Sequence, residues 1–396
     1  MINSQELRRL SMDDFQAKAK EIIEKEGWDY YNYAAGRRWT YQDSINAFER
    51  YIIRPRIMCG IGDRDITTTV LGHRISVPIC AAPSALHVYA HPNGERESAK
   101  GVEESGSLMI LSSEASVTIA DVAEAAPGGF RWMQTYIFKN RKHTEHIVRQ
   151  AERAGFKAIV LTVDSPVTVN WDELDDNFAE EGHLNTDPNY RCINLFIDIP
   201  EVHEAKASGD INLVKRYLPD QHNSPITWDD FEWLKSITSL PIVCKGILTA
   251  EAAKEAVDAG AAGIIVSAHG GRQLDGAPAP IDALAEVVDA VGDSNVEVYL
   301  DGGIRSGTDI FKALGRGARA VFLGRPILWG LACGGAAGVK RIFTMLGNEL
   351  KDVMALSGCP SLQEIPSGMV VHKSYYENRE HVSKSAKTCP KCTCKL

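Results

Sequence analysis

Short apolar segments alternate with longer amphipathic segments from residue 77 of this 396-residue chain onward. The amphipathic segments repeat with the period of a helix, whereas the apolar runs are short, as strands buried on both faces of a parallel sheet are. Eight runs are predicted strands: 77–82, 108–112, 132–136, 158–164, 241–246, 263–267, 296–301 and 320–324. The predicted helices among the amphipathic segments are 141–154, 250–259, 281–291, 308–314 and 337–356.

This alternation predicts an α/β fold, because strands separated by helices form parallel βαβ units. Eight such units favour closure into a (β/α)8 barrel, also called a TIM barrel. The alternative is a doubly wound open sheet, which usually has fewer strands and a GxGxxG turn that this sequence lacks. An amphipathic segment at 12–26 predicts a helical extension before the barrel, and 54–56 with 66–70 predict a short hairpin or extended layer. We expect a single domain over residues 1–375.

Two segments interrupt the pattern. Residues 166–228, after the fourth predicted strand, are polar and have little periodicity. Long connections in compact domains are commonly lids, and the position of this one predicts a lid over the active face. Residues 376–396 form a polar tail that we expect to be flexible.

Charge and cysteine content limit the partners that we expect. A formal net charge of -9 argues against a nucleic-acid partner. No apolar run approaches the roughly 20 residues of a membrane span, and the first residues lack the apolar core of a signal peptide. Nine scattered cysteines fit a reducing compartment better than a disulfide framework. Cys389, Cys392 and Cys394 lie close together, but without a nearby histidine they do not predict a tetrahedral metal site, so we expect no metal.

Most of the predicted strands end in a polar or reactive residue. The residues are Ser112, Gln134, Tyr136, Thr162, Asp164, Lys245, His269, Asp301 and Arg325. Packing in a barrel gives no reason for this pattern, whereas barrel enzymes build their active sites at the C-terminal ends of the strands. The pattern therefore predicts an enzyme.

The segment 264–275, IIVSAHGGRQLD, carries the clearest chemistry. His269 is able to take up or release a proton near neutral pH, and Arg272 offers a planar fork that fits a carboxylate. A base beside a carboxylate anchor predicts a substrate whose reactive centre is next to an acid group. Asp164 is placed to orient His269 and to stabilise its protonated form. Lys245 has two interpretations, as a Schiff-base lysine or as a stabiliser of a developing anion.

Two glycine-rich turns follow the last two predicted strands, DGGIRSGTD at 301–309 and Gly324-Arg325. Turns of this kind present backbone N–H groups and a helix N-terminus to a phosphate, and barrels hold phosphates after strands seven and eight. The alternative is a pair of ordinary turns. We favour a phosphate that belongs to a cofactor, because the polar residues exceed what one small substrate needs.

Several motifs together make the chain resemble the FMN-dependent 2-hydroxy acid oxidases, and within them the peroxisomal glycolate oxidase type. The motifs are Arg54-Pro55-Arg56, AAPSA (81–85), AHPNGE (90–95), LSS (111–113), LTVDSP (161–166), CKGILTAE (244–251), SAHGGRQLD (267–275), LDGGIRSGTD (300–309) and FLGRP (322–326). The resemblance covers about Leu10 to Ile365. It implies a (β/α)8 barrel that binds FMN and oxidises an (S)-2-hydroxy acid to the 2-oxo acid, with O2 reduced to H2O2.

The resemblance also implies roles for individual residues. The expected cofactor-binding residues are Pro83, Ser84, Ala85, Ser112, Gln134, Thr162, Lys245, Ser267, Asp301, Gly303, Arg305, Gly324 and Arg325. The expected catalytic residues are His269 as base, Asp164 as its partner, Lys245 beside the flavin and Tyr136. Tyr30, Tyr136 and Arg272 would hold the substrate carboxylate, although a gapped alignment would put Asn32 in the place of Tyr30. Alanine at Ala85 is typical of the members that use oxygen.

Three departures from the family pattern concern the substrate. Glu114 stands where glycolate-type members have tryptophan, Trp171 stands where the family has a second carboxylate-binding arginine, and Ala268 replaces asparagine. One hypothesis is a substrate larger than glycolate, aromatic or cationic, with Trp171 as an apolar wall and Glu114 facing a positive group. The other hypothesis is that Glu114 faces solvent and that Arg191 of the expected lid replaces the missing arginine.

The last three residues, Cys394-Lys395-Leu396, are similar to the Ser-Lys-Leu peroxisomal signal, which predicts a peroxisomal location and an import receptor as partner. A chance small–basic–leucine ending is the alternative. The family implies a homotetramer. Two other functions stay open, a flavin enzyme with another donor or acceptor, and a flavin-binding paralogue without turnover. The presence of His269, Asp164, Lys245 and Arg272 argues against the second of these.

Overall fold

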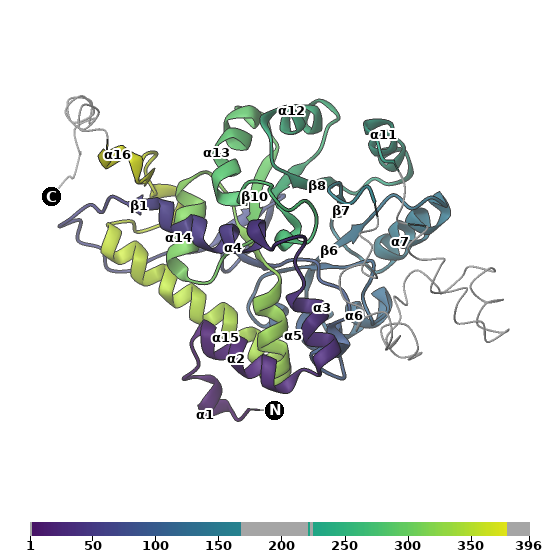
Figure 1. The fold of residues 1–396 in the computed structure, drawn as a ribbon, viewed down its shortest axis with the longest axis horizontal. Coiled ribbons are helices and arrows are strands. Elements are labelled where there is room, and N and C mark those ends of the chain that lie inside the picture. The colour runs from purple at the N-terminus through teal and green to yellow at the C-terminus, as the bar shows by residue number, and fades with distance from the viewer. Residues whose placement is uncertain (1, 168–220, 222–224, 378–396) are drawn as a thin grey trace.

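A closed barrel of parallel strands forms the centre of the molecule in the computed structural model, which describes residues 2–167, 221 and 225–377 (Figure 1). The strands are β4 (Ile79–Ala81), β5 (Leu108–Leu111), β6 (Phe130–Thr135), β7 (Ile159–Thr162), β8 (Ile242–Ile247), β9 (Gly263–Val266), β10 (Glu297–Asp301) and β11 (Val321–Leu323). They close in the order β10-β11-β4-β5-β6-β7-β8-β9. All eight predicted strands are confirmed, and the open sheet is excluded.

A helix follows each strand and covers the outside of the barrel. These helices are α5 (Glu95–Glu103), α6 (Ile119–Ala125), α7 (Arg141–Arg153), α11 (Trp228–Ile237), α12 (Ala250–Asp258), α13 (Pro280–Val291), α14 (Gly307–Gly315) and α15 (Arg325–Ser357). Their apolar faces bury against the strands; in α7, for example, Ile147, Val148 and Ala151 are buried. Among the described residues, no helix is long and apolar enough to cross a bilayer.

Large aromatic side chains fill the interior of the barrel. Trp132, Tyr299 and Phe322 are buried, with ring centroids 5.7 Å apart for Trp132–Tyr299 and for Tyr299–Phe322. The hairpin of β2 (Thr68–Val70) and β3 (His73–Ile75) packs two buried residues into the same cluster. A hairpin is therefore present, but the partner of 68–70 is 73–75 rather than the predicted 54–56, and the hairpin closes the N-terminal end of the barrel. The strand ends at the opposite face are left for a functional site.

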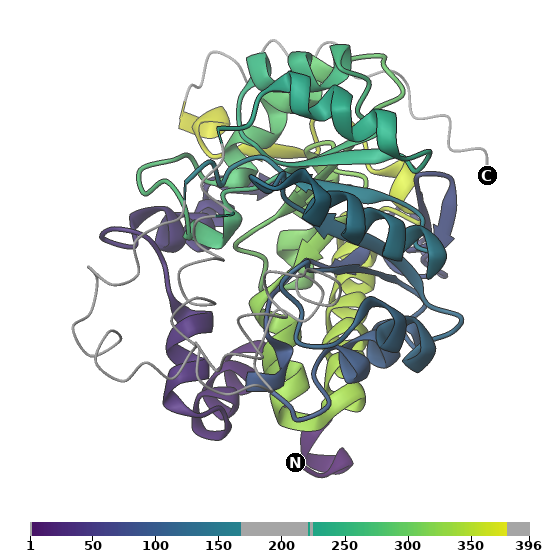
Figure 2. The same cartoon turned by 90° about the vertical axis from the view of Figure 1, so that its right-hand side faces the viewer.

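The N-terminal extension contains more helices than the sequence pattern predicts. Its elements are α1 (Ser4–Leu7), α2 (Met12–Ile22), α3 (Lys25–Asn32), α4 (Trp39–Asn46) and the 3-10 helix η1 (Ala47–Arg50). The one helix expected over 12–26 is two, because the backbone becomes extended at Ile23 and Glu24 while the Ile23 side chain is buried. Figures 1 and 2 show the first helices of the chain, α1 and α2, in purple beside α15, which packs against α2 and α5.

The C-terminal end of the described chain pairs with the segment that precedes the barrel. Strand β1 (Tyr51–Ile53) pairs antiparallel with β12 (Val370–His372), and the helical turn α16 (Ser374–Glu377) follows. Shorter 3-10 segments are η2 (His87–Tyr89), η6 (His269–Gly271) and η7 (Leu362–Glu364). Helix α15 starts at Arg325, earlier than predicted, and it is broken by non-helical backbone at Gly334 and Gly335.

One cluster of buried apolar side chains contains residues from Leu7 to Val370. The single domain over residues 1–375 stays a prediction. The expected lid at 166–228 lies outside the described residues except for 166, 167, 221 and 225–228. The expected flexible tail lies outside them from residue 378 on.

Candidate active site

A pocket opens at the C-terminal ends of the barrel strands, with a volume of about 1060 Å³ that includes space open to solvent. Among the predicted site residues, those that line it are Tyr30, Pro83, Ser84, Ala85, Ser112, Glu114, Gln134, Tyr136, Thr162, Lys245, His269, Arg272, Asp301, Gly303, Arg305, Gly324 and Arg325. Asp164 and Ser267 lie directly behind His269 and contact it. Trp171 lies outside the described residues.

His269 and Asp164 form the central pair. The His269 Nδ1 atom lies 2.7 Å from Asp164 Oδ1, and the His269 backbone N–H donates to Ser267 Oγ at 3.0 Å. Because Nδ1 faces the carboxylate and His269 lines the pocket, Nε2 is the ring nitrogen available to a bound molecule. Burial by itself would raise the pKa of Asp164, but the charges of His269 and Lys245 outweigh it and lower that pKa. Asp164 is therefore a stable negative partner for a protonated imidazole.

A β-bulge in β8 makes room for the Asp164 side chain. The register of β8 against β9 shifts between Lys245 and Ile247, and Gly246 has a φ of +112°. A Cβ at Gly246 would lie 2.6 Å from Asp164 Cβ and Cγ. Any larger residue would therefore push the aspartate away from His269, so this strand position requires glycine.

Replacing Gly246 with alanine should displace Asp164 and slow the reaction of the loaded enzyme. A shift of this kind lowers the rate by about ten- to a hundred-fold, because catalytic pairs tolerate little misplacement. Rapid-mixing measurements of flavin reduction would detect the loss. Gly155→Ala is the matched control, because Gly155 also has a positive φ but would meet nothing within 4 Å. An equal loss of rate in both variants would attribute the effect to backbone strain rather than to Asp164.

Lys245 and Asp301 lie at the base of the pocket. Their side chains are almost completely buried, and Lys245 Nζ is 3.7 Å from Asp301 Oδ2. Burial raises the pKa of Asp301, and the Lys245 charge offsets part of that rise. Within the described part of the chain, Asp301 Oδ1 and Asp164 Oδ2 have no hydrogen-bond partner. Buried polar atoms usually have partners, so these two oxygens indicate capacity for a bound polar molecule.

A row of neutral polar side chains crosses three adjacent strand ends. Gln134 Nε2 donates to Thr162 Oγ1 at 3.1 Å, and Gln134 Oε1 accepts from the Ser113 backbone N–H at 3.0 Å. Ser112 lies beside them on the pocket wall. These contacts fix the direction of each side chain, so the row is preorganised for a planar ligand with hydrogen-bonding edges.

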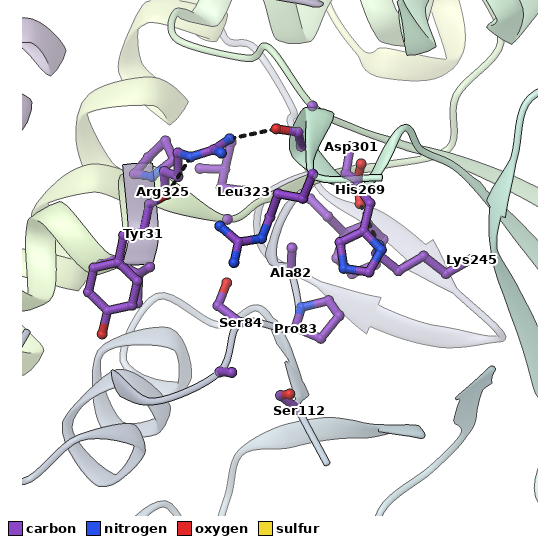
Figure 3. A pocket seen from close by; sticks show the side chains of 18 of the residues that line it. Tyr31, Ala82, Pro83, Ser84, Ser112, Lys245, His269, Asp301, Leu323 and Arg325 are labelled. Atoms are coloured by element: carbon purple, nitrogen blue, oxygen red, sulfur yellow. Dashed lines mark hydrogen bonds and ion pairs between the residues drawn. The ribbon is translucent and has the colours of Figure 1, made fainter. Parts of the chain in front are cut away.

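Arg325 connects the barrel to the N-terminal helices. Its Nε, Nη1 and Nη2 atoms donate to the carbonyl oxygens of Tyr31, Gly270 and Tyr33 at 2.8, 2.9 and 2.7 Å. A guanidinium carries five N–H donors, so these three bonds leave two for a ligand. Figure 3 shows Arg325 and Tyr31 on one side of the pocket and His269 and Lys245 on the other.

Arg272 directly follows the 3-10 helix η6, which begins at His269, and it lines the pocket. Its guanidinium carbon lies 4.9 Å from the centre of the Tyr30 ring, and Nη1 donates to the Tyr30 carbonyl at 2.8 Å. This stacking holds the fork over the face of the ring. Asn32, the alternative to Tyr30, accepts a hydrogen bond from Arg38 and is absent from the pocket lining. The structure therefore favours the ungapped alignment that selects Tyr30.

The last part of the turn before α14 is capped by carboxylates of the chain itself. Asp309 Oδ2 accepts the backbone N–H groups of Arg305 and Ser306, and Glu349 accepts that of Gly307. These first N–H groups of the helix are thus already satisfied. An anion at this turn would be held chiefly by the side chains of Arg305 and Arg325.

The group of cations tests whether an anionic cofactor fits the pocket. Arg272, Arg305 and Arg325 all line it together with Lys245. Burial lowers the pKa of Arg325, and the charges of Arg272 and Arg305 lower it further. Clustered buried cations destabilise one another unless an anion neutralises them. The residues therefore fit bound anionic groups such as a phosphate and a carboxylate.

Sequence reasoning missed several lining residues from the N-terminal helices. They are Tyr31, Tyr41, Ser44 and Ile45. Aromatic residues in helices usually pack in a core, and nothing in their spacing indicates that α3 and α4 cover a strand end. The approach is close: a Cβ at Gly303 (φ +78°) would overlap the Ser44 carbonyl oxygen. The second glycine of the DGG motif is the available signal for this contact.

The comparisons with known proteins agree with this geometry. The model of the FMN-dependent dehydrogenase family matches residues 19–372. Human 2-hydroxyacid oxidase 1 is 43% identical over 363 residues, which cover 92% of this chain and 96% of the relative. Glycolate oxidase 1 of Zea mays is 45% identical, covering 91% of this chain and 95% of the relative.

A solved structure has the same fold. A mandelate oxidase variant with (S)-mandelic acid superposes with a TM-score of 0.79 at 33% identity, and the match covers 92% of this chain and 98% of that one. The family model and the two relatives each cover nearly the whole barrel. The chain belongs to the FMN-dependent dehydrogenase family.

Proposed function

We propose that this protein oxidises (S)-2-hydroxy acids to 2-oxo acids with FMN as cofactor and O2 as final acceptor. The observation that carries the proposal is the His269–Asp164 pair, with its 2.7 Å contact, in the same pocket as the Arg272 fork. An arginine that binds the substrate carboxylate would bring the neighbouring substrate atoms to the base, so the base would remove a proton close to the acid group. The family membership and the names of the relatives support the same chemistry.

The pocket offers a place for each part of FMN. Arg305 and Arg325 would hold the phosphate, while Ser112, Gln134 and Thr162 would line the ring together with Pro83, Ser84 and Ala85. Figure 3 shows Pro83, Ser84 and Ser112 close together in the pocket. Lys245, buried beside Asp301, would lie against the ring and favour negative charge there. Ser267, Asp301, Gly303 and Gly324 would complete the cofactor contacts. Bound FMN supplies a two-electron acceptor for the hydrogen on the α-carbon and a route for those electrons to O2.

The chain's own residues then bind the acid and move its proton. Arg272 would hold the substrate carboxylate, with Tyr30 and Tyr136 as further hydrogen-bond donors. Burial raises the pKa of Tyr136, and Glu114 and Asp164 raise it further, so this phenol stays protonated and able to donate. His269 Nε2 would take the proton of the α-hydroxyl as the α-hydrogen leaves with its electron pair. Asp164 would stabilise the resulting imidazolium, so both hydrogens leave the substrate and a 2-oxo acid remains.

An anaerobic reduction experiment tests this function. The purified holoenzyme, mixed without oxygen with a panel of 2-hydroxy acids from glycolate to mandelate, should lose its yellow colour with at least one class. Admitting air should restore the colour and release one equivalent of H2O2 for each 2-oxo acid formed. Bleaching without rapid reoxidation by air would indicate another electron acceptor. Flavin that stays oxidised with every hydroxy acid would contradict the proposal.

The location and assembly belong to the same proposal. The ending Cys394-Lys395-Leu396 supports import into peroxisomes by the receptor for such tails, where H2O2 is handled safely. A fluorescent protein that carries the last ten residues should become punctate, and removal of Leu396 from it should make it diffuse. We further propose a homotetramer, which sedimentation equilibrium of the holoenzyme tests directly.

A further inference from the structure

The substrate end of the pocket contains a carboxylate that the proposed reaction does not use. Glu114 follows β5 and lines the pocket, between residues that are buried on both sides in the sequence. Within the described part of the chain, the only other acidic residue in the lining is Asp301, which lies beside Lys245 at the base. Among the described residues, Glu114 is therefore the one lining carboxylate that does not lie beside Lys245.

The backbone around Glu114 is clamped, so its side chain is presented from a rigid turn. The Glu114 N–H donates to Ser112 Oγ at 3.1 Å, and its carbonyl accepts from the Leu86 N–H at 3.4 Å. Two residues further on, the Ser116 N–H donates to the buried carboxylate of Glu95 at 3.0 Å. The same carboxylate accepts the His87 N–H, which ties this turn to the loop after β4. A rigid turn keeps Glu114 in one place relative to the site.

Glu114 follows β5 and Tyr136 follows the adjacent paired strand β6, and both residues line the pocket at these neighbouring strand ends. The negative charge of Glu114 is one of the main causes, after burial, that raise the pKa of Tyr136. Asp164, Tyr30 and Arg272 act on the same phenol. A substrate held by Arg272 and touched by Tyr136 therefore extends into the electrostatic field of Glu114.

We propose that Glu114 forms a cation-binding subsite, and that the preferred substrates are 2-hydroxy acids with an ammonium group on the side chain. This inference rests on the proposed oxidase function and names its substrate class. An ammonium would be attracted by the negative charge of Glu114 inside a partly buried site, whereas a methyl group of the same size would gain no such attraction. A second carboxylate would be repelled.

The test compares substrates of equal shape and different charge with the holoenzyme. Three amino-bearing acids, 3-amino-2-hydroxypropanoate, 4-amino-2-hydroxybutanoate and 5-amino-2-hydroxypentanoate, are each paired with the analogue in which methyl replaces the ammonium; malate provides the anionic case. At the best chain length, the ammonium compound should reduce the flavin with a kcat/KM about ten- to a hundred-fold higher than its methyl partner. Malate should be the poorest of its size.

Two variants and a binding measurement connect the preference to this residue. Glu114→Gln should bring the ammonium and methyl compounds to equal kcat/KM, whereas Glu124→Gln, an equal charge change on the exposed face of α6, should leave the preference intact. 4-Aminobutanoate and pentanoate have no α-hydroxyl and therefore measure binding alone. In proteins that keep Glu114, 4-aminobutanoate should perturb the flavin absorbance at a lower concentration than pentanoate does, and Glu114→Gln should remove this difference.

The outcomes separate this inference from the function on which it rests. Equal or better reaction of the methyl compounds at every chain length in the native enzyme would overturn the cation subsite while leaving the oxidase function in place. A preference that survives in Glu114→Gln would assign it to another residue and would also overturn the subsite. Flavin that no hydroxy acid reduces would overturn both. The native-enzyme comparison does not depend on the folding of any variant.

Discussion

Replacing His269 with glutamine should leave FMN bound and slow its reduction by 2-hydroxy acids by about 10²- to 10⁴-fold, the usual contribution of a positioned general base. Glutamine keeps a polar side chain of similar length beside Asp164, but it cannot take up the hydroxyl proton. The carboxylate fork at Arg272 is unchanged, so binding of a non-reacting carboxylate should change little. Stopped-flow bleaching measures the rate, and titration with the carboxylate measures binding.

The histidine experiment has a matched control at the other end of the barrel. His73 is exposed in the hairpin that closes the N-terminal end, so His73→Gln should reduce flavin at the native rate. Native-like reduction in His269→Gln would disprove the base assignment. Loss of FMN from that variant would instead indicate that His269 supports the structure of the pocket.

Replacing Lys245 with methionine should lower the free energy of unfolding by about 3–5 kcal/mol, because it removes one member of a buried ion pair and leaves the other. The remaining carboxylate of Asp301 is almost completely buried, and burial already raises its pKa above 3.8 in the native protein. Without the Lys245 charge, that pKa should rise further. The loss of stability should be visible in urea unfolding of the cofactor-free protein.

The stability loss of Lys245→Met should also change with pH, and the direction of that change is a second, independent prediction. An acid whose pKa is higher in the folded state binds more protons when folded, so its stability falls as pH rises through the folded value. The Lys245→Met defect should therefore be larger at neutral pH than in mild acid. The control is Lys254→Met on the exposed face of α12, which should change stability by no more than about 0.5 kcal/mol. A defect independent of pH would mean that Asp301 is not the group left unpaired.

The barrel and most of its chemistry follow from local sequence signals. Each strand is a short apolar run, most of these runs end in a polar residue, and the strand ends meet at one face in every (β/α)8 barrel. That rule alone brings Asp164, Lys245 and His269 together, although more than a hundred residues separate the first and the last. Parallel strands buried on both faces tolerate little ambiguity of pattern, which is why all eight were predictable.

The parts that could not be predicted depend on contacts between distant segments. Nothing around Gly246 indicates that its missing Cβ makes space for Asp164. Nothing in the glycine-rich motif indicates that Asp309 and Glu349 cap the backbone N–H groups of the turn at 305–307. The break between α2 and α3 depends on the burial of Ile23. The amphipathic pattern of the sequence continues across this residue and therefore gives no sign of the break. In each case tertiary packing selects among locally acceptable conformations.

The contacts of Arg325 determine when, during synthesis of the chain, the pocket is able to form. Arg325 donates to the Tyr31 carbonyl, 294 residues earlier in the chain. As the protein is synthesised, the N-terminal helices leave the ribosome long before the guanidinium that holds their end has been made. Such distant contacts form late, because a long loop must close before they contribute. A nascent chain that stops before the eighth barrel strand is therefore unable to retain the cofactor, so FMN binding reports that synthesis of the barrel is complete.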